Sequence, residues 1–137
     1  MSKMNARLRA ELLETAFKAV ELDLMPMTQG NLSVRDADTG LIAVTPHDLP
    51  FTEMTVQDIV VVDAKGNQVE GDREMSAETP VHLAVYEGRK ECDAIVHAEP
   101  IFTNAFGVLH MPIEPVYVNM AIDVGGSVPV MPFADSG

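Results

Sequence analysis

The first segment of the chain alternates apolar and polar residues with the period of an α-helix. Apolar residues recur every three or four positions and form one stripe: Leu8, Leu12, Ala16 and Ala19, widened by Leu13, Phe17, Val20 and Leu24. Pro26 follows where a helix has usually ended. The pattern therefore predicts an amphipathic helix over residues 3–24, with one face against a core.

The next segment predicts paired strands, because short apolar runs are separated by turn sequences. Leu32–Arg35 and Leu41–Thr45 flank the turn formers of residues 36–40. The strongly apolar run Asp58–Asp63 predicts a buried strand. A turn at residues 65–67 then leads into a short strand, Gln68–Glu70.

Helices and strands continue to alternate in the rest of the chain. Residues 77–89 predict a helix that Ser76 can cap, with Pro80 in the first turn, where proline is tolerated. Four further elements are predicted: a strand over Cys92–His97, a helix over residues 101–109, and strands over Val116–Met120 and Val128–Val130. This alternation predicts an α/β layered domain, and the paired strands favour a mixed, mainly antiparallel sheet.

Composition narrows the class of protein. The 137 residues fit one domain, so we expect residues 1–137 to form a single domain. A net charge of −12 repels nucleic acid and anionic membranes, so neither is an expected partner. No apolar run approaches the roughly 20 residues that span a bilayer. The charged start is not a signal peptide, and the single cysteine, Cys92, excludes an internal disulfide. We therefore expect a cytoplasmic protein.

A histidine and a carboxylate at the end of a predicted strand are candidates for a metal site. His97 and Glu99 lie two residues apart, and side chains at that spacing on a strand point the same way. Imidazole and carboxylate can together bind zinc or a similar divalent ion. A strand-end histidine is also common as a hydrogen-bonded structural residue, so both interpretations stay open.

Glu78, in the first turn of the predicted helix, also has two interpretations. The helix N-terminus stabilises a carboxylate there, and a carboxylate facing a metal-bound substrate can act as a general acid/base. Gly30–Asn31 and Ser76 lie at junctions between loops and elements, where exposed backbone N–H groups can hold a phosphate or simply form a turn. His82 reads as a packing residue of the same helix, since apolar residues surround it.

Taken in order, these segments resemble one known family. The series TQGNLSVR, VTPHDLPF, DIVVVDAKGNQVEGDREMSAETPVHLAVYEGR and DAIVHAEPIFTNA, followed by GGSVPVMPFA, is similar to the class II aldolase/adducin-head family. The resemblance implies a three-layer α/β/α sandwich that lacks its C-terminal part here, and assembly as a homo-oligomer, usually a tetramer. It also implies cleavage or epimerisation of a small sugar phosphate, such as fuculose 1-phosphate. In the family, zinc or another divalent ion stabilises an enediolate.

The resemblance assigns roles to individual residues. Three pairs match the family's phosphate-binding positions: Gly30 and Asn31, His47 and Asp48, and Ser76 and Ala77. Glu78 matches its catalytic acid/base, and His97 matches the first histidine of its His-x-His metal pair.

Departures from the family pattern keep alternative functions open. Glu99 replaces the second metal histidine, Asp48 replaces a glycine, and the family's third metal histidine lies beyond the region matched. One hypothesis is an aldolase-type lyase that receives its missing ligand from downstream sequence or a neighbouring subunit. A second is a catalytically inactive, adducin-head-like assembly protein. A third is an epimerase, dehydratase or decarboxylase of the same family.

Overall fold

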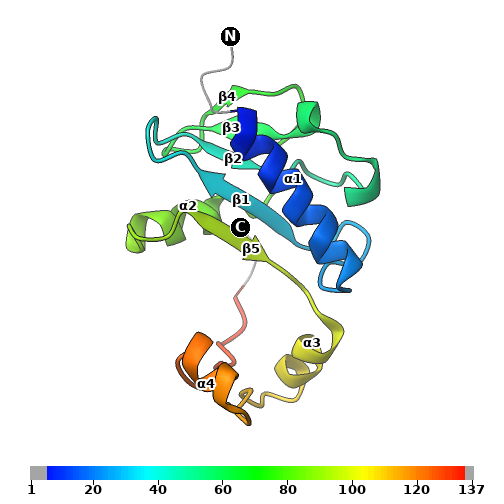
Figure 1. The fold of residues 1–137 in the computed structure, drawn as a ribbon. Coiled ribbons are helices and arrows are strands. Elements are labelled where there is room, and N and C mark those ends of the chain that lie inside the picture. Colours follow the sequence, from blue (N-terminus) through cyan, green and yellow to red (C-terminus); the bar gives the residue numbers. More distant parts are fainter. Residues whose placement is uncertain (1–5, 135–137) are drawn as a thin grey trace. The chain divides into compact units, whose positions relative to one another are not determined.

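The computed structural model describes residues 6–134, and in this range the strands form one sheet in the order β4-β3-β2-β1-β5 (Figure 1). The strands are β1 (Asn31–Arg35), β2 (Ile42–Val44), β3 (Val60–Val62), β4 (Gln68–Glu70) and β5 (Ala94–His97). All neighbours pair antiparallel. The predicted mainly antiparallel sheet is therefore confirmed, and each of these strands overlaps a predicted segment.

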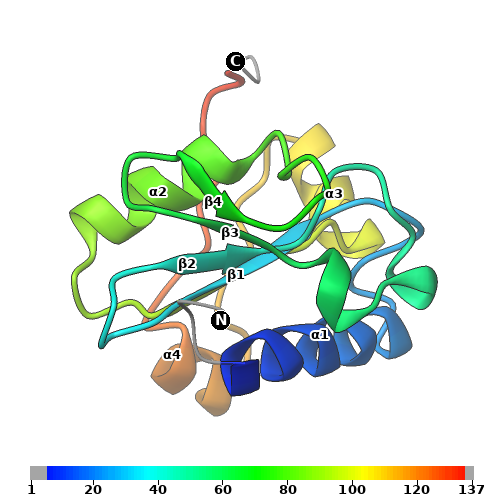
Figure 2. The ribbon, with the colours of Figure 1, turned by 90° about the horizontal axis from the view of Figure 1, so that it is seen from above.

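Two helices cover opposite faces of the sheet and give it three layers (Figures 1 and 2). Helix α1 (Ala6–Glu21) packs its apolar stripe on one face, and α2 (Thr79–Gly88) covers the other. Residues 3–5 of the predicted first helix lie outside the described residues. Between β2 and β3 run two short 3-10 helices, η1 (Phe51–Glu53) and η2 (Val56–Asp58). The predicted α/β/α sandwich is confirmed.

Alternation along each strand builds two separate apolar clusters. On the α1 side, buried strand residues pack against the helix stripe: Leu32, Ala43 and Val61. On the α2 side lie Ile42, Val44, Val60 and Val62, with Tyr86 from α2. Since successive strand residues face opposite sides, Asn31 and Ser33 of β1 point to the α2 side. Polar residues are thus placed under α2.

The chain divides into two units, Met1–Ala98 and Glu99–Gly137. The second unit contains α3 (Ile101–Val108), which confirms the predicted helix there, and α4 (Val118–Asp123). The strand predicted over Val116–Met120 is wrong, because α4 begins within it. The strand over Val128–Val130 is also wrong: Val128 forms only an isolated bridge with Ile113, and Pro129 has no N–H to extend it. The prediction of one domain over residues 1–137 stays a prediction.

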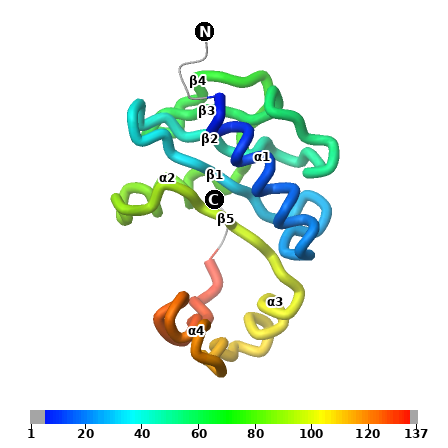
Figure 3. The backbone as a smooth tube through the Cα atoms, in the orientation of Figure 1, coloured from blue at the N-terminus to red at the C-terminus, as the bar shows by residue number. Residues whose placement is uncertain are grey.

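The longest of the described helices is α1, drawn in blue in Figure 3, with 16 residues. Within residues 6–134, none of them combines the length and the apolar character that crossing a bilayer requires.

Arg35, the last residue of β1, joins the end of α2 to the start of β5. Its guanidinium donates to the carbonyl oxygens of Lys90 and Cys92 at 2.7 Å each, and to that of Tyr86 at 3.3 Å. It also pairs with Asp93 at 3.0 Å and stacks 5.0 Å from the centre of the Tyr86 ring. One side chain therefore binds a carbonyl group in the last turn of α2 and two carbonyl groups in the connection to β5.

We expect Arg35→Met to lower the free energy of unfolding by about 1.5–3 kcal/mol, since several bonds to a charged donor are lost. Arg89→Met is the matched control. It removes an ion pair with Glu91 in which both side chains are more than 70% exposed, so its effect is expected to stay within about 0.5 kcal/mol. Urea unfolding measures both variants. Equal losses would contradict the role given to Arg35.

Candidate functional site

The three predicted substrate-binding pairs lie on adjacent segments at one end of the sheet. The Thr45 N–H donates to the Leu32 carbonyl at 3.0 Å, and the Ser76 N–H donates to the Thr45 carbonyl at 3.3 Å. A bridge between Pro46 and Met75 continues this pairing. The structure therefore brings together Gly30–Asn31, His47–Asp48 and Ser76–Ala77, which are far apart in sequence.

Gly30 and Asn31 begin β1 directly beside β5. Asn31 pairs with His97 in the antiparallel register. Gly30 has φ +88°, and a Cβ at this position would lie 2.5 Å from the His97 carbonyl oxygen. Asn31 is buried, and its Oδ1 has no hydrogen-bond partner among the described residues. A glycine is thus required where β1 starts next to the candidate metal histidine.

Ser76 and Glu78 form the junction that begins α2. Ser76 is buried, and its Oγ accepts a hydrogen bond from the Glu78 N–H at 3.2 Å. Glu78 is the N-cap residue, although the sequence suggested Ser76 for this position. The Glu78 carbonyl accepts from the N–H groups of Val81 and His82. The half-buried Glu78 side chain consequently starts from a fixed backbone at the site end of the helix.

His47 and Asp48 lie in an exposed loop at the same end. The His47 N–H donates to the Glu74 carbonyl at 2.9 Å, which fixes the first residue of the pair. Asp48 has φ +46°, in the left-handed region that favours glycine and that aspartate also tolerates. The backbone here therefore retains a glycine-like conformation while the side chain adds a negative charge.

His97 ends β5, and its Nδ1 is buried without a hydrogen-bond partner among the described residues. Glu99 belongs to the second unit, so its pairing with His97 stays a prediction. Within residues 6–134, no group of three or more His, Cys, Asp or Glu side chains converges to hold a metal ion. Imidazole and carboxylate are donors that a divalent ion accepts, so the donor types fit. They supply only part of a ligand set.

A buried polar chain under α2 was missed by the sequence interpretation. His82 is 1% exposed, and its Nδ1 lies 2.6 Å from the Ser33 Oγ. The same Oγ lies 2.7 Å from the Tyr86 hydroxyl. The expected packing role of His82 is confirmed by its burial, but its polar contacts were not anticipated. The available signal was the spacing of His82 and Tyr86, which puts them one turn apart on one helix face.

Burial is the main cause of the pKa shifts of His82 and Tyr86. It lowers the pKa of His82 from 6.5 to about 4, and the neighbouring charge of His97 acts in the same direction. Burial raises the pKa of Tyr86 to about 12, and its hydrogen bond with Ser33 opposes that rise. Both groups are therefore neutral near pH 7.

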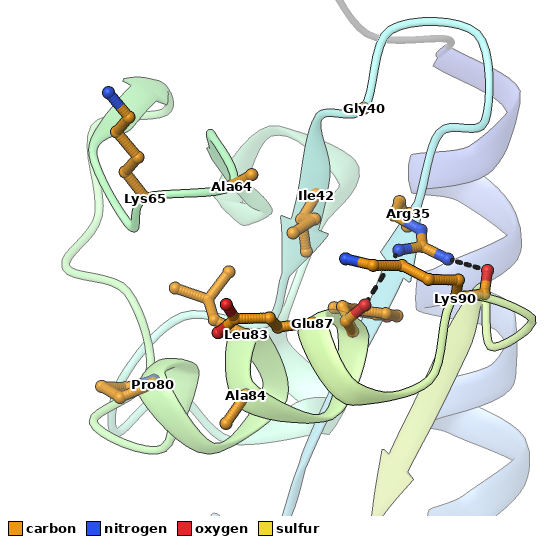
Figure 4. A pocket seen from close by; sticks show the side chains of 11 residues that line it. Arg35, Gly40, Ile42, Ala64, Lys65, Pro80, Leu83, Ala84, Glu87 and Lys90 are labelled. Carbon is orange, nitrogen blue, oxygen red and sulfur yellow. Dashed lines mark hydrogen bonds between the residues drawn. The ribbon is translucent and has the colours of Figure 1, made fainter.

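One cavity, of about 510 Å³, lies elsewhere on the α2 side (Figure 4). It is lined by residues that include Arg35, Ile42, Lys65, Leu83, Glu87 and Lys90. None of the predicted site residues lines it. The Arg35 guanidinium is already bound to carbonyl groups there, as the dashed lines in Figure 4 show. This cavity thus adds nothing to the candidate site.

Comparison with protein families gives a match over nearly the whole chain. The model for the class II aldolase and adducin N-terminal domain matches residues 10–137. An L-fuculose phosphate aldolase of Escherichia coli K12 is 32% identical over 131 residues, which cover 96% of this chain and 60% of that protein. An L-ribulose-5-phosphate 4-epimerase of Salmonella paratyphi C is 28% identical, over 90% of this chain and 54% of that protein.

Solved structures agree with the sequence comparison. The structure of an L-fuculose 1-phosphate aldolase superposes with a TM-score of 0.82 and 38% identity, over 87% of this chain and 56% of that one. The chain thus spans about 60% of the length of the curated aldolases that it matches.

Proposed function

Because this chain belongs to the class II aldolase and adducin N-terminal domain family, we propose that it is part of a metal-dependent lyase that cleaves a small sugar phosphate. One observation carries the proposal. Gly30–Asn31, Ser76, Glu78 and His97 come from separate segments, and backbone pairing gathers these segments at one end of the sheet. The similarity to L-fuculose phosphate aldolases suggests an L-fuculose 1-phosphate-like substrate.

The residues of this chain would bind the phosphate and move a proton. Backbone N–H groups at Gly30–Asn31, His47–Asp48 and Ser76–Ala77 would hold the phosphate oxygens, since such groups favour anions even in a protein of net charge −12. The Glu78 carboxylate would transfer the proton at the carbon–carbon bond that breaks. The negative Asp48 opposes a phosphate and restricts how closely one approaches its own backbone N–H.

A divalent ion, which we propose is zinc, would be held by His97 and Glu99, with a further ligand from outside the residues described or from a neighbouring subunit. When bound, such an ion polarises the substrate carbonyl and stabilises the enediolate. A homo-oligomer would supply such a neighbour, and a tetramer is the state that we expect. We place the protein in the cytoplasm, without nucleic-acid or membrane partners.

Two other functions of the same fold remain as competing proposals. The carboxylate of Glu99 and the charge of Asp48 favour a non-catalytic, adducin-head-like assembly protein. The similarity to a 4-epimerase favours a different reaction at the same site. An assay of aldol cleavage tests the assembly protein against the lyase, because the assembly protein is inactive with any divalent ion while its oligomer stays intact.

We expect Glu78→Gln to reduce kcat for L-fuculose 1-phosphate cleavage by about 10²–10⁴-fold, because an amide cannot transfer the proton. Glu87→Gln changes an exposed carboxylate on the same helix and is the matched control, with kcat expected to be unchanged. Coupled detection of dihydroxyacetone phosphate measures both, and metal analysis of His97→Ala tests the ion separately. If the Glu78→Gln variant cleaves the substrate at the wild-type rate, the role given to Glu78 is refuted.

A further inference from the structure

Three buried polar side-chain atoms on the α2 side of the sheet have no hydrogen-bond partner among the described residues. They are the Asn31 Oδ1, the His82 Nε2 and the His97 Nδ1. Asn31 and His97 are register partners on neighbouring strands, and the ring of His97 lies beside the ring of His82. A buried polar atom left unpaired costs roughly 1–3 kcal/mol, so three such atoms together indicate a shared ligand.

The spacing of the two imidazole rings fits a bridging water and is too long for a direct hydrogen bond between their nitrogens. The centres of the His82 and His97 rings are 6.4 Å apart, with the ring planes tilted by 50°. A ring nitrogen lies roughly 1.2 Å from its ring centre, so two facing nitrogens are at least about 4 Å apart, beyond a direct hydrogen bond. Two hydrogen bonds of about 2.8 Å through one water span this distance.

We propose that one buried water joins the His82 Nε2, the His97 Nδ1 and the Asn31 Oδ1, and that His82 is thereby a positioning residue for the His97 imidazole. Three polar partners are the number that a buried water typically has. The water accepts from the two ring N–H groups and donates to the Asn31 oxygen, so every one of the three atoms is satisfied.

The hydrogen bonds behind His82 supply the required proton. The Ser33 Oγ lies 2.7 Å from the Tyr86 hydroxyl and 2.6 Å from the His82 Nδ1. We assign the Tyr86 O–H as the donor to Ser33 and the Ser33 O–H as the donor to His82. A neutral imidazole that accepts at Nδ1 carries its proton on Nε2. His82 is 1% exposed, and burial favours the neutral imidazole, which turns its Nε2–H to the water. With these donor directions, Nε2 is the nitrogen of His82 that donates.

The bridge determines what His97 offers to a ligand. With Nδ1–H held by the water, the His97 Nε2 keeps its lone pair free. Metal-binding histidines usually donate their other ring N–H to such a partner, which orients the ring and raises its basicity. The link to an ion rests on the proposed function, whereas the water bridge itself does not.

Two variants of His82 separate its two nitrogens. His82→Gln places an amide near the position of Nε2 and keeps a partner for the water, and His82→Asn places it near Nδ1 and removes that partner. We expect zinc affinity, measured by titration of the metal-free protein, to fall about 10- to 100-fold in His82→Asn and to stay within about threefold in His82→Gln. Val60→Ala removes buried apolar volume on the same side of the sheet, outside the polar chain, and controls for destabilisation, with zinc affinity unchanged.

A second measurement needs no metal. In the metal-free protein, the ¹⁵N chemical shift of the His97 Nδ1 is expected to change in His82→Asn and to persist in His82→Gln. If neither variant changes it, or both change it equally, the bridge is refuted. A wild-type protein that shows these shifts and binds no divalent ion would refute the proposed function and leave the bridge intact.

Discussion

Gly30→Ala is expected to destabilise the protein by roughly 2–5 kcal/mol, through a strained backbone and a collision with a neighbouring strand. Gly30 has φ +88°, and the added Cβ would lie 2.5 Å from the His97 carbonyl oxygen and 3.2 Å from two carbons of Met25. The Met25 side chain can adjust, but the carbonyl belongs to β5 and moves only with that strand. One methyl group would therefore displace the end of β5 that carries His97.

Gly40→Ala isolates the contribution of backbone strain. Gly40 has φ +71°, and a Cβ there meets no atom of the described residues within 4 Å. We expect this variant to lose only about 1–2 kcal/mol, the cost of the left-handed conformation alone. Urea unfolding measures the free energy of unfolding of both variants. The difference between their losses is the contribution of the collision with the His97 carbonyl oxygen. Equal losses would show that contact with β5 does not set the requirement for glycine at position 30.

The sheet was predictable because the pattern of apolar and polar residues in each strand indicates which side chains are buried. In β1, Leu32 faces α1 and Ser33 faces α2, an alternation visible in the printed sequence. The strand predictions were wrong in the second unit. The run near Val118 has β-branched residues, but no strand lies beside it among the described residues. A strand forms only where a partner completes its hydrogen bonds, and local sequence does not specify that partner.

Helix α2 shows a second limit of local reasoning. The apolar residues around His82 suggested that this histidine packs in the interior, yet its neighbours Val81 and Val85 are 51% and 37% exposed. The buried residues are Thr79, His82 and Tyr86, which share one face at helical spacing. Polar groups can occupy that face because each finds a hydrogen bond, such as Thr79 to the Ser76 carbonyl at 2.6 Å. Such pairing depends on the tertiary fold.

From the sequence, only the family resemblance predicted that these residues form one site. Gly30, His47 and Ser76 converge because β1, β2 and the segment before α2 pair side by side. No local pattern reports that pairing. The convergence of Glu78, His97 and Glu99 on one ion stays a prediction, because Glu99 lies in the second unit.

Acid is expected to destabilise the protein between pH 6.5 and about 4, through His82. Its pKa is about 4 in the folded state and 6.5 in a solvated chain, chiefly because of burial and then because of the His97 charge. In this window the unfolded state binds the additional proton, so stability is complete above pH 6.5 and is lost as the pH falls towards 4. The loss amounts to at most about 3 kcal/mol.

His82→Gln tests this assignment, because glutamine does not titrate. Unfolding by urea at pH 7, 5.5 and 4.5 is expected to show a steep loss in the wild type and a shallower one in the variant. Among the described residues, His82 lies against Ser33, which in turn contacts the neutral Tyr86, and beside His97. Asp58 and Asp63 also have lowered pKa values, through hydrogen bonds from Thr55 and Asn67 respectively, but these carboxyl groups lose their contribution only below about pH 4. An identical slope in both proteins would assign the acid sensitivity to a group other than His82.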